Sequence, residues 1–430
     1  MKTNRPIASG ANAVRPAGFI LLALSLLVSL LFAPLASAQE LSLPSGVTDR
    51  VAPDDDAMGT KLGGFTAYPK LGLSAGYDDN ILATETNQRS DARFQIDPSL
   101  AYDSNWSSNS LSLGGFLSSR LYSTETSQDS LDWGFGGSGQ LDVLTDTNIQ
   151  GMVGYQNLTD PRGGVNDPVN APDPVQYDLL QAGLVGNHSV NKIDLSVGGD
   201  FQQYEYDDAS QQYRDRNVWG VSGQGGYTFS PGYSAFVRGT YNQRDFDNLS
   251  APLPAPNPPG TFVTQDSSGY NVALGIASEI TNLISGEAYI GYLDQDYDSP
   301  SFEDVDGVSF GVNLEWAPSK LTTVRLTGSR EVVDSTNPIA GGIFYSLAGI
   351  GVEHELSKDV ELKGDFSYYN GDYVGSTRED NGYRFSLGAD YRLSRQVHLD
   401  LIYSYDDRDS NQAGQDYTRN LVTVGVTLQH

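Results

Sequence analysis

The chain has 430 residues and no cysteine, and its 54 acidic residues outnumber its 26 basic residues to give a formal charge of −28. The lack of cysteine excludes disulfide staples, thiolate metal sites and cysteine nucleophiles. The acidity argues against a nucleic-acid partner, since phosphate binding needs lysine and arginine. It suits cations, or divalent ions that bridge to anionic lipid headgroups, although acidic loops also keep a protein soluble without any such role.

Residues 1–38 have the features of a secretory signal peptide. A basic start that includes Arg15 precedes an apolar run over residues 18–33. Small residues follow at positions 36–38, so we expect cleavage near Ala38 and a mature chain that begins at Gln39. The alternative, an uncleaved anchor helix, fits less well because the apolar run is short for a membrane span.

Residues 39–65 show neither strand nor helix periodicity. They contain Pro44, Pro53 and an acidic run at residues 54–56. We therefore interpret this stretch as a flexible periplasmic N-terminal segment, with a docking role as the alternative.

Residues 66–430 consist of alternating segments joined in turn by short and long links. Short turns on one side and long loops on the other are typical of a transmembrane antiparallel up-and-down β-barrel, so the predicted fold class is all-β. We count about eighteen strands, with sixteen as the alternative. The strands centre on residues 71–77, 94–102, 111–122, 131–143, 148–155, 177–188, 193–206, 218–229, 233–246, 270–280, 286–297, 308–316, 321–331, 344–356, 360–369, 383–393, 397–405 and 418–428.

The links themselves have different compositions. The predicted short turns are residues 105–109, 230–232, 318–319, 357–358 and 394–395. The longest links, residues 158–176 and 245–268, are rich in proline and acidic residues. Because the barrel is wide, these two loops are candidates to fold inward and gate it.

Each strand has one apolar face and one polar face. In residues 110–121, Leu111, Leu113 and Leu117 share one face, whereas Ser112 and Arg120 lie on the other. The polar face carries too much charge for a dry core, because burying unpaired charge is costly. A wet lumen removes that cost and separates a membrane barrel from a soluble β-sandwich, whose apolar face points inward.

Aromatic residues cluster near the predicted strand ends, as in the two girdles of a membrane barrel. The candidates before or after the long loops are Tyr122, Trp133, Tyr204, Trp219, Tyr241, Tyr270, Tyr292, Tyr368, Tyr383 and Tyr403, and those near the short turns are Trp106, Phe229, Trp316 and Tyr391. Two features resist the pattern. Pro98 interrupts a strand and predicts a bulge, and residues 344–356 have an indistinct lipid face.

Charged residues on the polar faces are the candidate pore lining. Mixed signs on facing walls create a transverse field at a constriction, whereas the alternative is that these residues pair across neighbouring strands and only stabilise the wall. The predicted lining residues are Arg93, Asp97, Arg120, Lys192, Asp194, Asp200, Arg238, Arg244, Glu287, Arg325, Lys363, Asp365, Arg384, Asp390, Arg392 and Asp400.

Three short stretches resemble a known family. Residues 77–81 (Tyr-Asp-Asp-Asn-Ile), Pro98 in the second strand and residues 104–106 (Ser-Asn-Trp) are similar to the putative β-barrel porin 2 family of outer-membrane proteins. The resemblance extends over most of the chain after the signal peptide. It implies an outer-membrane barrel associated with exopolysaccharide production, with a role in export across the outer membrane.

The last strand resembles the signal that the barrel-assembly machinery recognises. Thr423, Gly425 and Leu428 occupy its polar, glycine and late apolar positions. The chain departs from the pattern at His430, where an aromatic residue such as phenylalanine is usual.

Enzymatic and metal chemistry find little support. His188, His354, His398 and His430 all map near the short turns or the terminus, away from the outer loops where a catalytic group would meet substrate. Aspartates at 294, 296 and 298 are spaced like the start of a calcium loop, but Ser299 and Val305 stand where that motif needs glycine and glutamate. We expect no enzyme, no cofactor and no defined metal site.

The sequence therefore predicts a porin in the outer membrane of a Gram-negative cell, with passive passage of solutes or exported polysaccharide through a charged lumen. Its expected partners are outer-membrane lipid and lipopolysaccharide, the barrel-assembly machinery, and polysaccharide with its export partners, but no nucleic acid. Two alternatives remain: a non-conducting anchoring barrel linked to exopolysaccharide export, and a soluble secreted β-protein.

Overall fold

A computed structural model describes residues 57–165, 167, 171–249, 262–281, 284–337 and 339–430. The predicted signal peptide, its cleavage site near Ala38 and most of the predicted N-terminal segment lie outside these residues. Within the described part, no helix is long and apolar enough to cross a membrane. Two short 3₁₀ helices, η2 (Thr126–Gln128) and η3 (Gln212–Arg214), lie in loops.

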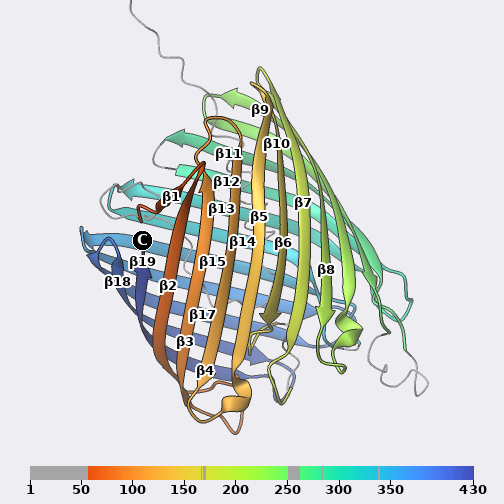
Figure 1. Cartoon of the computed structure of the whole chain (residues 1–430). Coiled ribbons are helices and arrows are strands. Elements are labelled where there is room, and N and C mark those ends of the chain that lie inside the picture. Colours follow the sequence, from red (N-terminus) through yellow and green to blue (C-terminus); the bar gives the residue numbers. More distant parts are fainter. Residues whose placement is uncertain (1–56, 166, 168–170, 250–261, 282–283, 338) are drawn as a thin grey trace, which may run out of the picture.

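Eighteen of the nineteen described strands form one closed antiparallel barrel, which confirms the predicted fold and strand number (Figure 1). Each strand pairs with its sequence neighbours, and β19 closes the ring on β2 with Leu421 opposite Asp78 and Gln429 opposite Lys70. The strands are β2 (Phe65–Asp78), β3 (Asp91–Ser104), β4 (Ser110–Tyr122), β5 (Ser130–Leu144), β6 (Thr147–Thr159), β7 (Gln176–Val190), β8 (Ile193–Tyr206), β9 (Arg216–Ser230), β10 (Tyr233–Phe246), β11 (Ser267–Thr281), β12 (Ile284–Tyr297), β13 (Val305–Ser319), β14 (Thr322–Asp334), β15 (Gly342–Ser357), β16 (Val360–Tyr373), β17 (Glu379–Ser394), β18 (Val397–Ser410) and β19 (Tyr417–Gln429).

A further short strand, β1 (Thr60–Leu62), lies in the stretch for which the sequence predicts no regular structure. It folds back on the start of β2, with Thr60 opposite Ala67. The backbone N–H of Gly59 donates to the carbonyl of His430 at 3.1 Å. The hairpin is thus tied to the last residue of the chain, a contact that strand periodicity cannot foresee.

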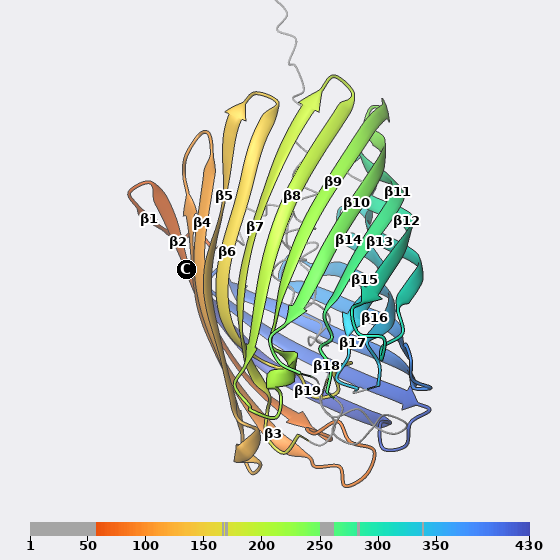
Figure 2. The ribbon, with the colours of Figure 1, turned by 90° about the vertical axis from the view of Figure 1, so that its right-hand side faces the viewer.

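Short turns and long loops gather at opposite ends of the barrel, which we call the turn end and the loop end. The turn end is uppermost in Figure 2. Two-residue turns such as residues 191–192 and 231–232 use the left-handed conformation, with φ of +54° at Asn191 and +75° at Gly232. Three predicted turns lie one or two residues further along the chain: 320–321, 358–359 and 395–396.

The predicted alternation is confirmed, with the apolar face outward. Val197 and Val424 are 66% and 57% exposed, whereas Thr423, between outward-facing neighbours, is buried. Most predicted girdle residues are also exposed, but Tyr122 and Tyr204 are not. Both are buried on the inward face, so their assignment to a girdle is wrong. The prediction used only their position near a strand end, and that position does not determine to which face of the strand a side chain points.

Pro98 does not produce the predicted bulge. Its pairing with Leu71 of β2 keeps the register of the whole strand. On its other side, pairing with β4 runs from Ile96–Ser119 to Ser99–Phe116 in one unbroken register. The missing N–H interrupts hydrogen bonding locally without inserting a residue.

The indistinct lipid face of β15 has a structural cause. Pairing between β13 and β14 reaches only Phe310 and Arg330, although both strands continue beyond this point toward the loop end. There Phe344 of β15 is buried in a cluster with Leu293, Tyr297, Phe302 and Val305. The loop end of β15 therefore serves as packing surface, and the lipid-facing pattern is lost.

Candidate functional site: the lumen and its crossing loop

Fifteen of the sixteen predicted lining residues lie in strands, on the polar face. The exception is Lys192, which is exposed in the two-residue turn between β7 and β8. Those within strands are Arg93, Asp97, Arg120, Asp194, Asp200, Arg238, Arg244, Glu287, Arg325, Lys363, Asp365, Arg384, Asp390, Arg392 and Asp400.

Several of these residues pair with carboxylates on nearby strands. Arg325 Nη1 donates to Glu353 Oε1 at 2.8 Å, and Arg392 Nη2 donates to Glu361 Oε2 at 2.6 Å. Arg238 makes a bidentate contact with Glu287 at 3.0 and 2.9 Å. The prediction missed Glu353 and Glu361. Glu361 shares its face with Lys363, so parity alone identifies it, whereas Glu353 lies on the strand with the indistinct face.

The described part of the loop between β6 and β7, residues 160–165, 167 and 171–175, enters the lumen and reaches the far wall. We call it the crossing loop. Its backbone carbonyls accept three hydrogen bonds: Gly163 from Tyr417 Oη at 3.1 Å, Gly164 from Arg408 Nη1 at 3.4 Å and Val165 from Tyr373 Oη at 2.9 Å. The donors lie on β19, β18 and β16. The predicted inward folding of this loop is therefore confirmed.

Close packing fixes the tip of the crossing loop. Val165 joins a buried cluster with Val333, Ala340, Ile343 and Tyr373. Gly163 has φ of +78°, and a Cβ atom there would lie 2.6 Å from Tyr417 Oη and 2.9 Å from Ala83 Cβ. Only glycine meets both the backbone conformation and the lack of space.

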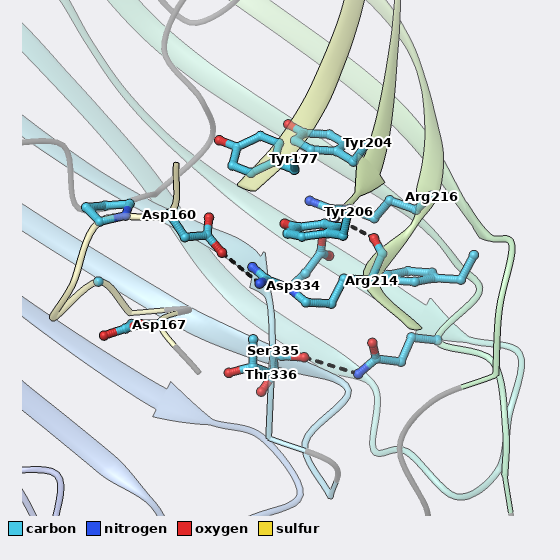
Figure 3. Close-up of a pocket in the computed structure, with 14 residues that line it drawn as sticks. Asp160, Asp167, Tyr177, Tyr204, Tyr206, Arg214, Arg216, Asp334, Ser335 and Thr336 are labelled. Carbon is cyan, nitrogen blue, oxygen red and sulfur yellow. Dashed lines mark hydrogen bonds and ion pairs between the residues drawn. The ribbon is translucent and has the colours of Figure 1, made fainter. Parts of the chain in front are cut away.

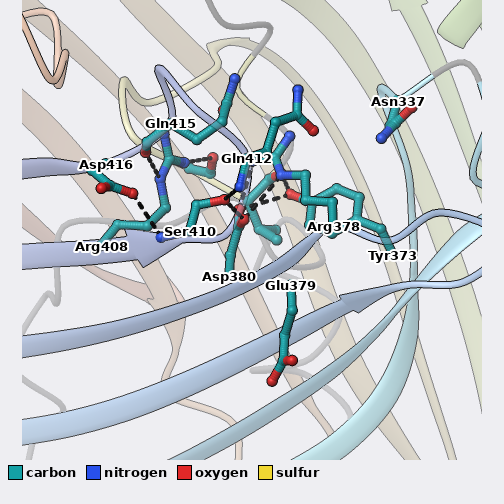
Figure 4. Close-up of polar contacts among 12 residues, drawn as sticks. Asn337, Tyr373, Arg378, Glu379, Asp380, Arg408, Ser410, Gln412, Gln415 and Asp416 are labelled. Carbon is teal, nitrogen blue, oxygen red and sulfur yellow. Dashed lines mark hydrogen bonds and ion pairs between the residues drawn. The ribbon is translucent and has the colours of Figure 1, made fainter.

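The donors that hold the tip are themselves held by a polar network at the loop end (Figure 4). Arg378 forms a bidentate ion pair with the buried carboxylate of Asp380 at 2.9 and 2.6 Å. Ser410 Oγ donates to the same carboxylate at 2.6 Å, and Tyr373 Oη lies 3.2 Å from it. Arg408 Nε donates to the carbonyl of Gln415 at 2.7 Å. Tyr373 and Arg408 are thus also held by contacts that do not involve the crossing loop.

The near part of the crossing loop is anchored by ion pairs. Asp160 Oδ2 accepts from Arg214 Nη1 at 2.7 Å, with both side chains buried. Asp167 Oδ2 accepts from the Gly163 N–H at 2.8 Å, and its other oxygen lies 3.9 Å from Arg162. Burial raises the pKa of Asp167 to about 6.

A second inward contact comes from the end of β14. Asp334 lies between two arginines of β9 and β10: its Oδ2 is 2.7 Å from Arg216 Nε, and its Oδ1 accepts from Arg244 Nη1 at 2.5 Å. In Figure 3, Asp334 lies beside Arg214, Tyr206 lies between Arg214 and Arg216, and Tyr177 and Tyr204 lie above them. The Arg216 guanidinium lies 3.9 Å from the centre of the Tyr204 ring.

The sequence prediction missed Arg214 and Arg216. Arg214 is the last residue of η3 and Arg216 the first of β9, four and two residues ahead of the predicted strand. Arg214 stacks on Tyr206 at 4.2 Å, and Tyr206 lies 5.2 Å from Tyr177. No sequence signal separates this cluster from ordinary loop arginines, because its partners come from four distant segments.

The family model described as putative beta-barrel porin 2 matches residues 52–430. The chain belongs to this family. Similar solved structures include the copper transporter OprC, with a TM-score of 0.49 and 10% identity over 86% of this chain and 82% of that one. OccAB4 of Acinetobacter baumannii gives 0.44 and 11% over 85% and 98%, and OpdL of Pseudomonas aeruginosa gives 0.45 and 13% over 86% and 99%. These likenesses concern the barrel fold alone. No curated protein matches the sequence significantly.

This family member is therefore an outer-membrane, porin-like barrel, and the crossing loop lies across its lumen near the loop end. Between the crossing loop and the arginine–tyrosine cluster, a cavity of about 30 Å³ remains. One water molecule needs at least about 10–15 Å³ by the same measure, so this gap holds only one or two. A larger cavity of about 200 Å³ adjoins Arg216 and Arg244 on the lumen wall.

Other predicted sites have plain positions in the barrel. Among the described residues, no group of three or more histidine, aspartate or glutamate side chains is placed to hold a metal ion. Gly425 of the predicted assembly signal faces Asp400, and a Cβ atom there would lie 2.5 Å from its carboxylate. Thr423 faces inward, Leu428 is 40% exposed on the outer face, and His430 is the last residue.

Proposed function

We propose that the protein is an outer-membrane porin that passes small hydrophilic solutes passively, with the crossing loop setting the width of the lumen. The observation that carries this proposal is the docking of residues 163–165 on the far wall by three hydrogen bonds. A loop fixed across a wet, charged lumen restricts the size and charge of what passes. Neither enzymatic activity nor a cofactor is part of the proposal.

Passage of an exported polysaccharide is the wider form of the same proposal. It draws on the membership of the chain in a family whose members are often associated with exopolysaccharide production. A polymer would need a wide path, so the crossing loop, which is bonded to the far wall, would have to leave its docked position. The partners would then include a periplasmic export protein.

The docked crossing loop also favours a second candidate, a non-conducting barrel that anchors an export assembly. A soluble secreted protein is disfavoured, since exposed apolar side chains such as Leu274 and Ile276 belong in lipid. In either membrane form, the mature chain would follow cleavage near Ala38, insertion by the barrel-assembly machinery at the last strand, and contact with lipopolysaccharide.

Conductance in planar bilayers under a salt gradient tests the proposal. We expect steady unitary currents with a reversal potential that depends on the lumen charges. Arg325→Gln should shift that potential toward cation selectivity, because it removes a positive charge beside Glu353 and Glu315. Silence from folded, inserted protein would contradict a porin and support the anchoring barrel.

A further inference from the structure

The cavity of about 200 Å³ at the wall formed by β8, β9 and β10 has polar side chains and two arginines. Its lining includes the carboxylate of Asp200 together with Gln202, Thr240, Asn242, Arg216 and Arg244, with the end of β14 on the other side. By the measure used above, one water molecule needs at least about 10–15 Å³, so the cavity has room for a ligand the size of a sugar unit.

One carboxylate serves two guanidinium groups at this cavity. Asp334 contacts Arg216 at 2.7 Å and Arg244 at 2.5 Å. The Arg216 side chain is only 11% exposed and that of Arg244 only 13%, so each needs an anion beside it. Asp334 is the last residue of β14 and belongs to the segment that bends into the lumen. It occupies the place where an incoming acid would bind most strongly.

One side chain that lines the same cavity has a buried oxygen without a hydrogen-bond partner. The side-chain oxygen of Asn242 is buried and accepts no hydrogen bond from the described residues. A buried acceptor without a donor is costly, so it marks a place where a ligand or water supplies one. A hydroxyl group is a suitable donor, and Thr240 and Gln202 add further hydrogen-bonding groups around it.

We propose that this cavity binds a small hydroxylated carboxylate, a sugar acid, on its way through the lumen. The carboxylate replaces Asp334 on Arg216 and Arg244, and a hydroxyl donates to Asn242. The inference rests on the proposed porin function for the route to the site. A free sugar acid and an acidic residue of a polysaccharide present the same chemistry.

The test is binding of glucuronate to the folded full-length protein in detergent, measured by calorimetry, with glucose as the uncharged control. We expect glucuronate to bind and glucose to bind at least about tenfold more weakly, since glucose lacks the charge-assisted contacts. Arg244→Gln should weaken glucuronate binding about tenfold, and Asp334→Asn should strengthen it by removing the internal competitor. Arg89→Gln is the matched control, because Arg89 is exposed and pairs only with Glu125 in the outer loops among its described contacts.

Equal binding of glucose and glucuronate would overturn the proposal, and so would unchanged glucuronate binding in Arg244→Gln. The opposite signs expected for Arg244→Gln and Asp334→Asn keep it testable if one variant folds poorly. Tighter binding of trigalacturonate than of galacturonate would assign the site to a polymer. Binding of galacturonate without trigalacturonate would assign it to free acids. Either outcome supports the carboxylate site. Binding is measured without current, so a silent channel that binds glucuronate refutes the porin and leaves the site intact.

Discussion

The two halves of the lumen use the same alternating pattern for different purposes. Near the turn end, arginines pair with carboxylates on adjacent strands, as Arg325 does with Glu353. Near the loop end, arginines reach segments from elsewhere in the ring: Arg216 contacts Asp334 of β14, and Arg408 contacts the crossing loop. Lateral pairs stabilise the wall, whereas contacts across the lumen close it. Charge pattern along a strand therefore does not tell which role a residue has.

Among the variants, Gly163→Val should disturb the contacts across the lumen most strongly. The new Cβ would collide with Tyr417 and Ala83, and the left-handed backbone at φ +78° adds strain of about 1–2 kcal/mol. The tip of the crossing loop must then leave the far wall, so unitary conductance should rise about twofold or more. Single-channel recording in planar bilayers measures the change.

Gly414→Val is the matched control for this change. Gly414 has a similar φ of +85°, but no atom lies within 4 Å of its Cβ position. It therefore carries the strain without the collision. Equal conductance in both variants would show that docking of Gly163 does not limit the width of the lumen.

What the sequence can predict follows the same division. Alternation along strands such as β4 and β19 depends only on the lipid outside and the water inside, so strand number and facing can be read locally. Gly163, Arg216 and Asp334 act through contacts between segments far apart in the chain. Their partners are known only once the ring has closed, which is why the sequence does not identify Arg216.

Acidification should tighten the loop-end closure. Asp167 has a pKa of about 6 in the docked loop, against 3.8 for an exposed aspartate. The docked state therefore binds a proton more tightly than the undocked state, and docking gains as pH falls through 6 until about 4. A difference of about two pKa units corresponds to about 3 kcal/mol. We expect lower mean conductance at pH 5 than at pH 7.5.

Other charged groups lie near Asp167, namely Arg162, Asp160 and Arg408. The variant Asp167→Asn separates their effect, because it keeps the shape and removes the charge. It should conduct poorly at both pH values and lose most of the change between them. If Asp167→Asn keeps the full pH response, another group is responsible.

Tyr373→Phe should have the smallest effect and test a single contact across the lumen. It removes the hydroxyl that donates to the Val165 carbonyl at 2.9 Å and also lies 3.2 Å from Asp380, but keeps the ring in its buried cluster. One hydrogen bond contributes about 1 kcal/mol, so the undocked fraction of the crossing loop should rise about fivefold. Brief openings in single-channel records report that fraction.

Tyr345→Phe is the control, since Tyr345 packs against the same cluster and the described contacts give its hydroxyl no bond to the loop. More frequent openings in both variants would assign the effect to packing, and unchanged openings in Tyr373→Phe would leave Tyr417 and Arg408 as the contacts that hold the loop.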